Sequence, residues 1–207
     1  MKVAIINYGM GNLGSVRRSL ENLDADVIIA EHPKQLLDAN RVILPGVGAF
    51  GEGMKKLCSE GWIESLQVQV IEQGKPLLGI CLGMQMLSSL SEENGLNKGL
   101  NFIPGKVLRL DQLGCCFRLP HVGWNDVNYQ ENVSLFKKIP QQTDFYFVHS
   151  YAFIADDPAN IIATSAYDIS VTAAVRKNHI FGTQFHPEKS SKAGRQILKN
   201  FIEFTVC

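Results

Sequence analysis

A cysteine between two glycines is the residue whose type and setting best suit nucleophilic chemistry. Gly79, Cys81 and Gly83 belong to a Gly-Ile-Cys-Leu-Gly string, which follows an apolar run at 76–80 and precedes a helical run at 84–87. This is the nucleophile-elbow pattern with cysteine in place of serine, in which a sharp turn lifts the reactive side chain clear of a sheet. A helix that begins just after the cysteine favours the thiolate, the reactive form. The pattern therefore favours a catalytic Cys81 over the commoner buried, inert cysteine.

A cysteine nucleophile needs a neighbouring base, and the base needs a group that orients it. His186 stands at the end of an apolar run at 180–185 and is followed by Pro187 and Glu188. Proline favours an extended backbone before it, and two-residue spacing along an extended chain puts His186 and Glu188 on the same side. We therefore predict a triad of Cys81, His186 and Glu188, although this short string alone is also typical of a solvated loop.

Acyl transfer also needs hydrogen-bond donors for the negative charge that develops on the substrate oxygen. In an elbow, the backbone amide of Leu82 points towards an oxygen bound next to the sulfur. The Leu-Pro-Gly-Val-Gly-Ala-Phe string at 44–50 follows an apolar run at 41–44, and its glycines would let another amide approach a substrate carbonyl. A plain glycine turn would have the same composition, so both interpretations of this loop stay open.

A second glycine motif suggests a different chemistry. Gly9, Gly11 and Gly14 form a G-x-G-x-x-G pattern directly after the apolar run at 2–8, and Glu31 lies near the end of the next run. Such an arrangement is typical of a dinucleotide site, where amides at a helix N-terminus bind a pyrophosphate. A tight strand-to-helix turn needs the same glycines. The dinucleotide site remains a minor alternative that titration with NADH would reveal.

The elements that must position these residues differ between the two halves of the chain. The first half alternates continuous apolar runs with helical patterns, and Gly61 is a candidate break in the second helix. The apolar runs are 2–8, 27–30, 41–44 and 76–80, and the helical patterns are 15–23 and 54–73. Such alternation predicts a parallel sheet that helices cover on both faces.

The second half has strand-like runs joined by short turns, followed by a last helix at 191–204. The strand-like runs are 107–110, 145–149, 161–165, 172–176 and 180–185. We therefore predict one α/β domain over 1–207. Its central, mostly parallel sheet is flanked by helices and gains antiparallel strands in the C-terminal half.

Composition excludes several classes of function. Twenty basic and 20 acidic residues leave a formal net charge of zero, without the basic stripe that nucleic-acid binding needs. No apolar run reaches the roughly 18–20 residues that span a bilayer. Five cysteines in a chain too large for a disulfide scaffold predict reduced thiols in the cytoplasm. Cys115 and Cys116 lack neighbours at metal-ligand spacing, so we expect no metal there, and Cys58 and Cys207 are expected to be equally inert.

Together these residues resemble the class I, triad-type glutamine amidotransferases. The strings Gly-Ile-Cys-Leu-Gly-Met-Gln at 79–85 and Phe-His-Pro-Glu at 185–188 carry this likeness. Further strings resemble the branch formed by the glutaminase subunits of imidazole glycerol phosphate synthases, from histidine biosynthesis. They lie at 7–12, 45–50, 120–125, 146–151 and 184–190, and so span almost the whole chain. The resemblance implies a flavodoxin-like α/β fold and an enzyme without a cofactor.

The resemblance also implies a mechanism. Cys81 attacks the side-chain amide of glutamine to give a glutamyl thioester and ammonia, and water then releases glutamate. His186 transfers the protons, and Glu188 orients it. Family positions that bind glutamine match Gly48, Gln85, Ser150 and Tyr151, and those of the oxyanion hole match Val47, Gly48 and Leu82.

A partner follows from the same resemblance. In this branch, ammonia passes through a channel to a separate (β/α)₈ barrel, the cyclase subunit, in a heterodimer that makes imidazole glycerol phosphate and an aminoimidazole carboxamide ribotide. Asn12, His121, Trp124 and Lys189 match positions that face this partner, so the first glycine motif would serve docking. Two alternatives stay open: a related glutaminase that serves another acceptor, and a catalytically silent protein that docks on a synthase and regulates it.

Overall fold

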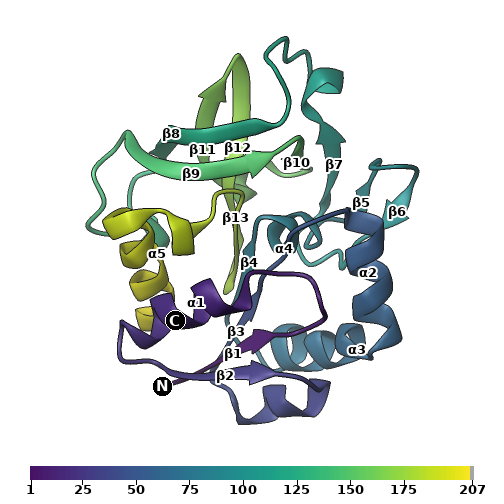
Figure 1. Ribbon diagram of the computed structural model, residues 1–207, viewed down its shortest axis with the longest axis vertical. Coiled ribbons are helices and arrows are strands. Elements are labelled where there is room, and N and C mark those ends of the chain that lie inside the picture. The colour runs from purple at the N-terminus through teal and green to yellow at the C-terminus, as the bar shows by residue number, and fades with distance from the viewer. Residues whose placement is uncertain (206–207) are drawn as a thin grey trace.

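The computed structural model describes residues 1–205, and Cys207 therefore lies outside the described residues. Its strands form a large sheet in the order β2-β1-β3-β4-β13-β12-β11-β8-β9 and a small one in the order β10-β7-β5-β6 (Figure 1). The first half of the chain supplies β1 (Lys2–Ile6), α1 (Leu13–Glu21), β2 (Asp26–Ala30), β3 (Arg41–Leu44), α2 (Phe50–Ser59), α3 (Trp62–Leu66), β4 (Leu77–Ile80) and α4 (Leu82–Gln85). The second half supplies β5 (Leu90–Ser91), β6 (Asn97–Lys98), β7 (Gly105–Arg109), β8 (His121–Tyr129), β9 (Thr143–His149), β10 (Tyr151–Ala155), β11 (Ile161–Tyr167), β12 (Ile169–Lys177), β13 (Ile180–Thr183) and α5 (Ser191–Glu203).

Strands β1 to β4 form the parallel part of the large sheet, and β1, β3 and β4 are buried on both faces. In β1, Val3 and Ile5 join a core cluster with α1 and α5, whereas Ala4 and Ile6 join a second cluster with α2 and α3. Figure 1 shows these helix pairs on opposite sides of the sheet. This alternation along a continuous apolar strand is the reason that helices cover both faces, as the sequence predicts.

The remaining strands of the large sheet pair antiparallel, except that β13 runs parallel to β4 and so joins the two parts. The predicted α/β class is confirmed, and the predicted run at 107–110 corresponds to β7, but β8 and the other strands of the small sheet were not identified from the sequence. Strand β8 was not predicted because its exposed and partly buried positions, including Gly123 and Asn125, leave it without a continuous apolar run. Strands β5 and β6 have two residues each, too few for a periodic pattern.

The predicted helical stretch at 54–73 is broken at Gly61, which adopts a left-handed φ of 75° between α2 and α3. Its helices begin earlier than expected, at Phe50, and end in a π-helical turn, η2 (Gln67–Glu72). The early start matters for the site because α2 begins directly after the loop that follows β3.

Candidate active site

Cys81 occupies a strained elbow between β4 and α4. Its backbone has φ 53° and ψ −108°, a conformation that costs a non-glycine residue on the order of 1–3 kcal/mol. Gly83 allows the turn to pack against β3, because a Cβ there would lie 1.8 Å from the Leu44 carbonyl oxygen. The expected helix after the cysteine spans Leu82–Gln85, two residues earlier than the predicted run at 84–87, and a single turn has only a weak dipole.

His186 and Glu188 are brought together as predicted, but not by an extended chain. His186 Nδ1 lies 2.8 Å from Glu188 Oε1, and both side chains are almost completely buried. Residues Pro187–Lys189 form a 3₁₀ turn, η6, so the expectation of two residues side by side on an extended segment is wrong. Because Nδ1–H donates its hydrogen bond to the carboxylate, Nε2 is the ring nitrogen left for catalysis.

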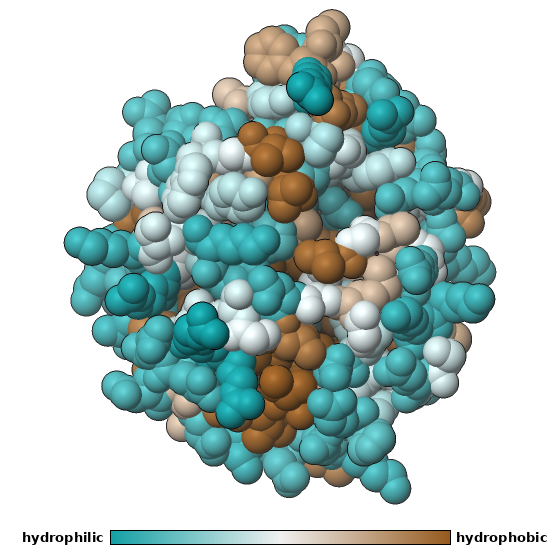
Figure 2. Space-filling model, in the orientation of Figure 1, coloured by the Kyte–Doolittle hydropathy of each residue, from teal (hydrophilic) through white to brown (hydrophobic). Residues whose placement is uncertain are grey.

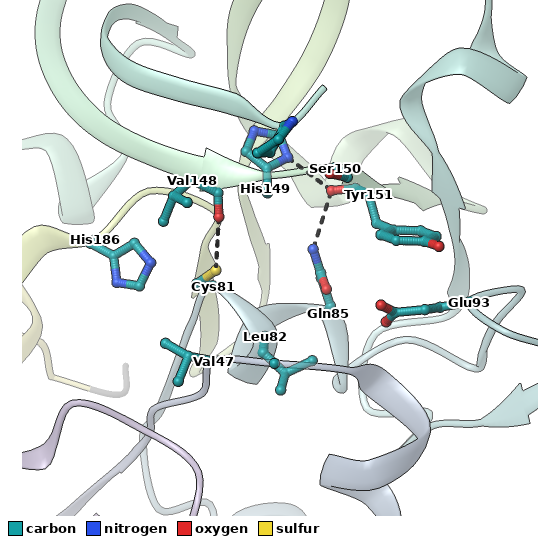
Figure 3. Close-up of a pocket in the computed structure, with 12 residues that line it drawn as sticks. Val47, Cys81, Leu82, Gln85, Glu93, Val148, His149, Ser150, Tyr151 and His186 are labelled. Carbon is teal, nitrogen blue, oxygen red and sulfur yellow. Dashed lines mark hydrogen bonds between the residues drawn. The ribbon is translucent and has the colours of Figure 1, made fainter. Parts of the chain in front are cut away.

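Nε2 of His186 is buried and has no hydrogen-bond partner among residues 1–205. Figure 3 shows the ring beside Cys81, on the opposite side of the sulfur from Gln85. Burial lowers the pKa of His186, but the neighbouring Cys81 and Glu188 outweigh it and raise the pKa to about 9. His186 therefore holds a proton firmly at neutral pH, as a group that accepts the proton of the cysteine must.

A cavity of about 360 Å³ opens over the sulfur. Its lining includes all the predicted oxyanion-hole and glutamine-binding residues, namely Val47, Gly48, Leu82, Gln85, Ser150 and Tyr151. In Figure 3, Val47 and Leu82 lie below the sulfur, while Tyr151 lies at the far end from His186. The cavity thus has a reacting end and a binding end.

The loop after β3 packs closely on its support. Tyr8 donates a hydrogen bond from Oη to the Pro45 carbonyl at 2.9 Å, and a Cβ on Gly46 would lie 2.7 Å from that Oη. Gly48 has a left-handed φ of 105°, and a Cβ there would lie 2.8 Å from Met10 Cε. These contacts explain why this loop needs its glycines whatever its catalytic role.

Glu93 is a cavity residue that was not predicted from the sequence. Its Oε2 accepts a hydrogen bond from the Phe50 amide at the start of α2, at 2.7 Å, and its carboxylate faces Tyr151 in Figure 3. The neighbouring Glu92 is equally acidic, so no pattern in the sequence distinguishes the two. His149 and Gln184 were also missed as individual functional residues. Both are buried; His149 lines the cavity, and Gln184 Nε2 lies 3.6 Å from Cys81 Sγ.

The four residues expected at a partner surface divide into two kinds. Trp124 is 53% exposed, Asn12 and Lys189 are also exposed, and Lys189 Nζ lies 5.6 Å from the centre of the Tyr146 ring. His121 differs from the expectation because it is only 3% exposed and lies below the surface. In the view of Figure 1, the surface shows apolar side chains gathered along the middle of the molecule and hydrophilic ones towards the rim (Figure 2).

The first glycine motif forms a tight strand-to-helix turn. Asn12 Oδ1 accepts a hydrogen bond from the Ser15 amide and caps α1. A Cβ on Gly11 would lie 3.2 Å from the side chain of Pro45, so this turn packs against the loop after β3. These contacts favour the structural interpretation of the motif.

The described structure contains neither a cluster of metal-ligating side chains nor a membrane-spanning helix. Within residues 1–205, His, Cys, Asp and Glu side chains form no group of three or more that could hold a metal ion. No helix in that range combines the length and apolar character needed to cross a membrane.

Comparisons with known proteins identify the family of this chain. The family model described as glutamine amidotransferase class-I matches residues 4–204. The chain is 45% identical to the imidazole glycerol phosphate synthase subunit HisH of Moorella thermoacetica, covering 97% of this chain and 94% of that protein. It is 44% identical to the subunit of the same name from Chlorobaculum tepidum, covering 98% of this chain and 100% of the relative.

Solved structures share the fold at low identity. A putative GMP synthase subunit from Thermoplasma acidophilum is 22% identical with a TM-score of 0.73, covering 98% of this chain and 92% of that chain. A structure described as a glutamine amidotransferase is 17% identical with a TM-score of 0.75, covering 97% of each chain. Taken with the family match, these findings establish that the chain belongs to the class-I glutamine amidotransferase family.

Proposed function

We propose that this chain, as one domain over 1–207, is the glutaminase subunit of an imidazole glycerol phosphate synthase. It hydrolyses glutamine to glutamate and ammonia and passes the ammonia to a separate cyclase subunit. The similarity to HisH subunits over nearly the whole chain supports the pathway. The buried His186–Glu188 pair beside an elbow cysteine supports the chemistry.

The first step is attack on the substrate amide. The Cys81 proton moves to His186 Nε2, and the thiolate forms a bond to the side-chain carbonyl carbon of glutamine. The electron pair of the carbonyl moves to its oxygen, where the Leu82 amide and the loop at Val47 and Gly48 stabilise the charge. Support for this arrangement comes from the shared cavity, in which the loop and Leu82 lie next to the sulfur.

The second step releases the products. The carbon–nitrogen bond breaks as His186 gives its proton to the nitrogen, so that ammonia leaves and a glutamyl thioester remains on Cys81. Water then loses a proton to His186 and its oxygen attacks the thioester carbon. The carbon–sulfur bond breaks, glutamate leaves, and His186 returns the proton to the sulfur. Glu188 stabilises the imidazolium that forms in each half-reaction.

The far end of the cavity suits the amino-acid group of glutamine. Glu93 offers a carboxylate to the substrate ammonium, and it is held in place by its bond to the Phe50 amide. Tyr151 lies at that end as well, and Gln85 and Ser150 provide further polar groups in the lining of the cavity. Charge complementarity at Glu93 would therefore orient the substrate with its amide towards Cys81.

The ammonia acceptor lies in the partner. We propose a (β/α)₈ barrel cyclase that binds in a heterodimer, receives ammonia through a channel, and makes imidazole glycerol phosphate and an aminoimidazole carboxamide ribotide. Exposed Asn12, Trp124 and Lys189 would contact it, with His121 supporting them from below. Residence in the cytoplasm stays a prediction from the cysteine content.

The buried His186–Glu188 pair next to Cys81 is the observation that carries this proposal. Its test is release of glutamate from glutamine, with and without the cyclase and its nucleotide ligand. We expect strong activity only when partner and ligand are both present. Strong activity of the isolated chain would indicate a differently regulated glutaminase. No release of glutamate under any of these conditions would contradict the proposal.

A further inference from the structure

A chain of hydrogen bonds runs through the molecule beside the cavity, and the Tyr151 carbonyl lies at its centre. On one side, His149 Nδ1 lies 2.9 Å from that carbonyl, and His149 Nε2 lies 3.0 Å from His121 Nδ1. His121 Nε2 in turn lies 3.2 Å from Asn125 Nδ2. This side connects the cavity to β8, the strand that also carries the exposed Trp124.

The other side leads from the same carbonyl to the sulfur. Gln85 Nε2 lies 3.1 Å from the Tyr151 oxygen and 3.0 Å from Gln184 Oε1. Gln184 Nε2 lies 3.6 Å from Cys81 Sγ. Gln184 is completely buried, and its backbone is fixed by a 2.8 Å hydrogen bond from its amide to the Ala173 carbonyl.

A backbone carbonyl can only accept hydrogen bonds, and this fixes the direction of the whole chain. His149 must donate from Nδ1 to Tyr151, so its Nε2 carries no proton and accepts from His121 Nδ1. His121 Nε2 then accepts from the Asn125 amide. Burial lowers the pKa of His121 to about 4 and that of His149 to about 3, so both rings are neutral near pH 7 and this direction persists.

The orientation of the Gln184 amide is fixed in the same way. Gln85 must turn its nitrogen towards the Tyr151 carbonyl, and that nitrogen also faces Gln184. Gln184 therefore presents its oxygen to Gln85 and its N–H groups to the sulfur. Rotating the Gln184 side-chain amide by half a turn would place its nitrogen against that of Gln85, so that two donors would face each other without an acceptor.

Besides His186, the sulfur has two polar neighbours of opposite character. As a thiol, Cys81 can donate to the Val148 carbonyl oxygen, 3.9 Å away. As a thiolate it can only accept, and the Gln184 N–H is then the favourable contact. We propose that Gln184 is a further catalytic residue, whose side-chain amide donates a hydrogen bond to Cys81 Sγ and stabilises the thiolate that attacks the substrate.

This inference rests on the proposed function for the identity of the substrate, but its test needs no substrate. Alkylation of Cys81 by iodoacetamide is followed as a function of pH in the full chain, by mass spectrometry of the peptide that contains Cys81. That readout separates Cys81 from the exposed Cys58 and Cys116. Gln184→Met keeps a side chain of similar size but removes the donor.

We expect the midpoint of alkylation in Gln184→Met to move up by about one pH unit, which corresponds to a tenfold change in the fraction of thiolate below the midpoint. The matched control is Thr183→Val, because the Thr183 hydroxyl is buried without a partner and should leave the midpoint unchanged.

An unchanged midpoint in folded Gln184→Met would overturn the proposal. Should that variant fail to fold, Gln184→Asn replaces it, since the shorter amide cannot reach the sulfur. We expect the same upward movement there, and an unchanged midpoint would overturn the proposal equally. Absence of glutamine hydrolysis in the wild-type chain would contradict the proposed function. The alkylation midpoints could still be compared, because that measurement uses no glutamine.

Discussion

Two regions of the molecule face each other across the cavity and contribute differently to the site. One consists of the glycine-rich turns after β3 and β4, and the other of buried polar side chains from the antiparallel part. The turns supply backbone amides and the strained Cys81, at the carboxyl ends of parallel strands. The antiparallel part, counted here together with β13 and the 3₁₀ turn that follows it, supplies His186, His149 and Gln184, and hydrogen bonds fix the direction of these side chains. Reacting atoms thus come from turns, and their orientation comes from side chains buried in the other part of the sheet.

Removing the nucleophile should have the largest effect. Cys81→Ala should reduce glutamine hydrolysis by at least about 10⁴-fold, because no other group can form the thioester. Complex formation and ammonia-dependent synthesis by the cyclase should be unchanged, and both are measured in the reconstituted complex. Loss of the ammonia-dependent reaction as well would mean that Cys81 is needed for structure.

A change in the antiparallel part tests whether orientation matters almost as much. Glu188→Gln should reduce kcat about 10²- to 10³-fold, because a neutral amide neither fixes the Nδ1 tautomer of His186 nor stabilises its imidazolium. Steady-state kinetics with glutamine provide the measurement. Glu92→Gln is the matched control at an exposed position and should retain wild-type kcat.

The loop after β3 tests the contribution of the turns. Gly48→Ala should reduce kcat about tenfold or more, because the residue would be strained at φ 105° and its Cβ would clash with Met10. Gly14→Ala is the control, since a Cβ there has no atom within 4 Å. Equal activity of both variants in the glutaminase assay would show that this loop conformation is not needed for catalysis.

The same comparison explains what the sequence could predict. Cys81, His186 and the glycine loop were identified because turns require glycine at fixed spacing and because strand ends are marked by apolar runs. Glu93 and the direction of the Gln184 amide were not, because they depend on contacts between segments far apart in the chain. Residues 187–189 were misjudged because proline restricts the residue before it and leaves the turn after it open.

The buried histidine pair should make stability depend on pH. His121 and His149 are neutral in the fold, with lowered pKa values of about 4 and about 3, whereas in the unfolded chain they titrate near 6.5. The unfolded state therefore binds more protons between these values, so stability is complete above about pH 6.5 and falls as the pH is lowered towards 4 and below.

His149→Phe removes one of these groups. Its free energy of unfolding, measured by urea denaturation, should depend less on pH than that of the wild type. Between about pH 6.5 and 4, the loss of stability should be smaller by on the order of 3 kcal/mol. Identical pH dependence in both proteins would contradict neutral burial of His149. This result would also remove one support for the direction of the hydrogen-bond chain.

The smallest effect is expected at the surface of β8. Trp124→Ala should weaken binding to the cyclase about tenfold, while leaving the unfolding midpoint within a degree or two, because its side chain is half-exposed. Titration calorimetry with the cyclase gives the affinity. Phe117→Ala is a comparison at a similarly exposed aromatic residue outside the predicted interface. Equal affinities for the wild type and Trp124→Ala would refute the docking role of Trp124.

The claim that the turns supply the nucleophile and the antiparallel part activates it is tested most directly by trapping the covalent intermediate. The chain is mixed with glutamine in the presence of the cyclase and its ligand, quenched in acid, and digested for mass spectrometry. We predict a glutamyl group on the peptide that contains Cys81, and more of it in variants that slow thioester hydrolysis. Glutamate release without any adduct on Cys81, or with an adduct on another cysteine, would contradict this claim.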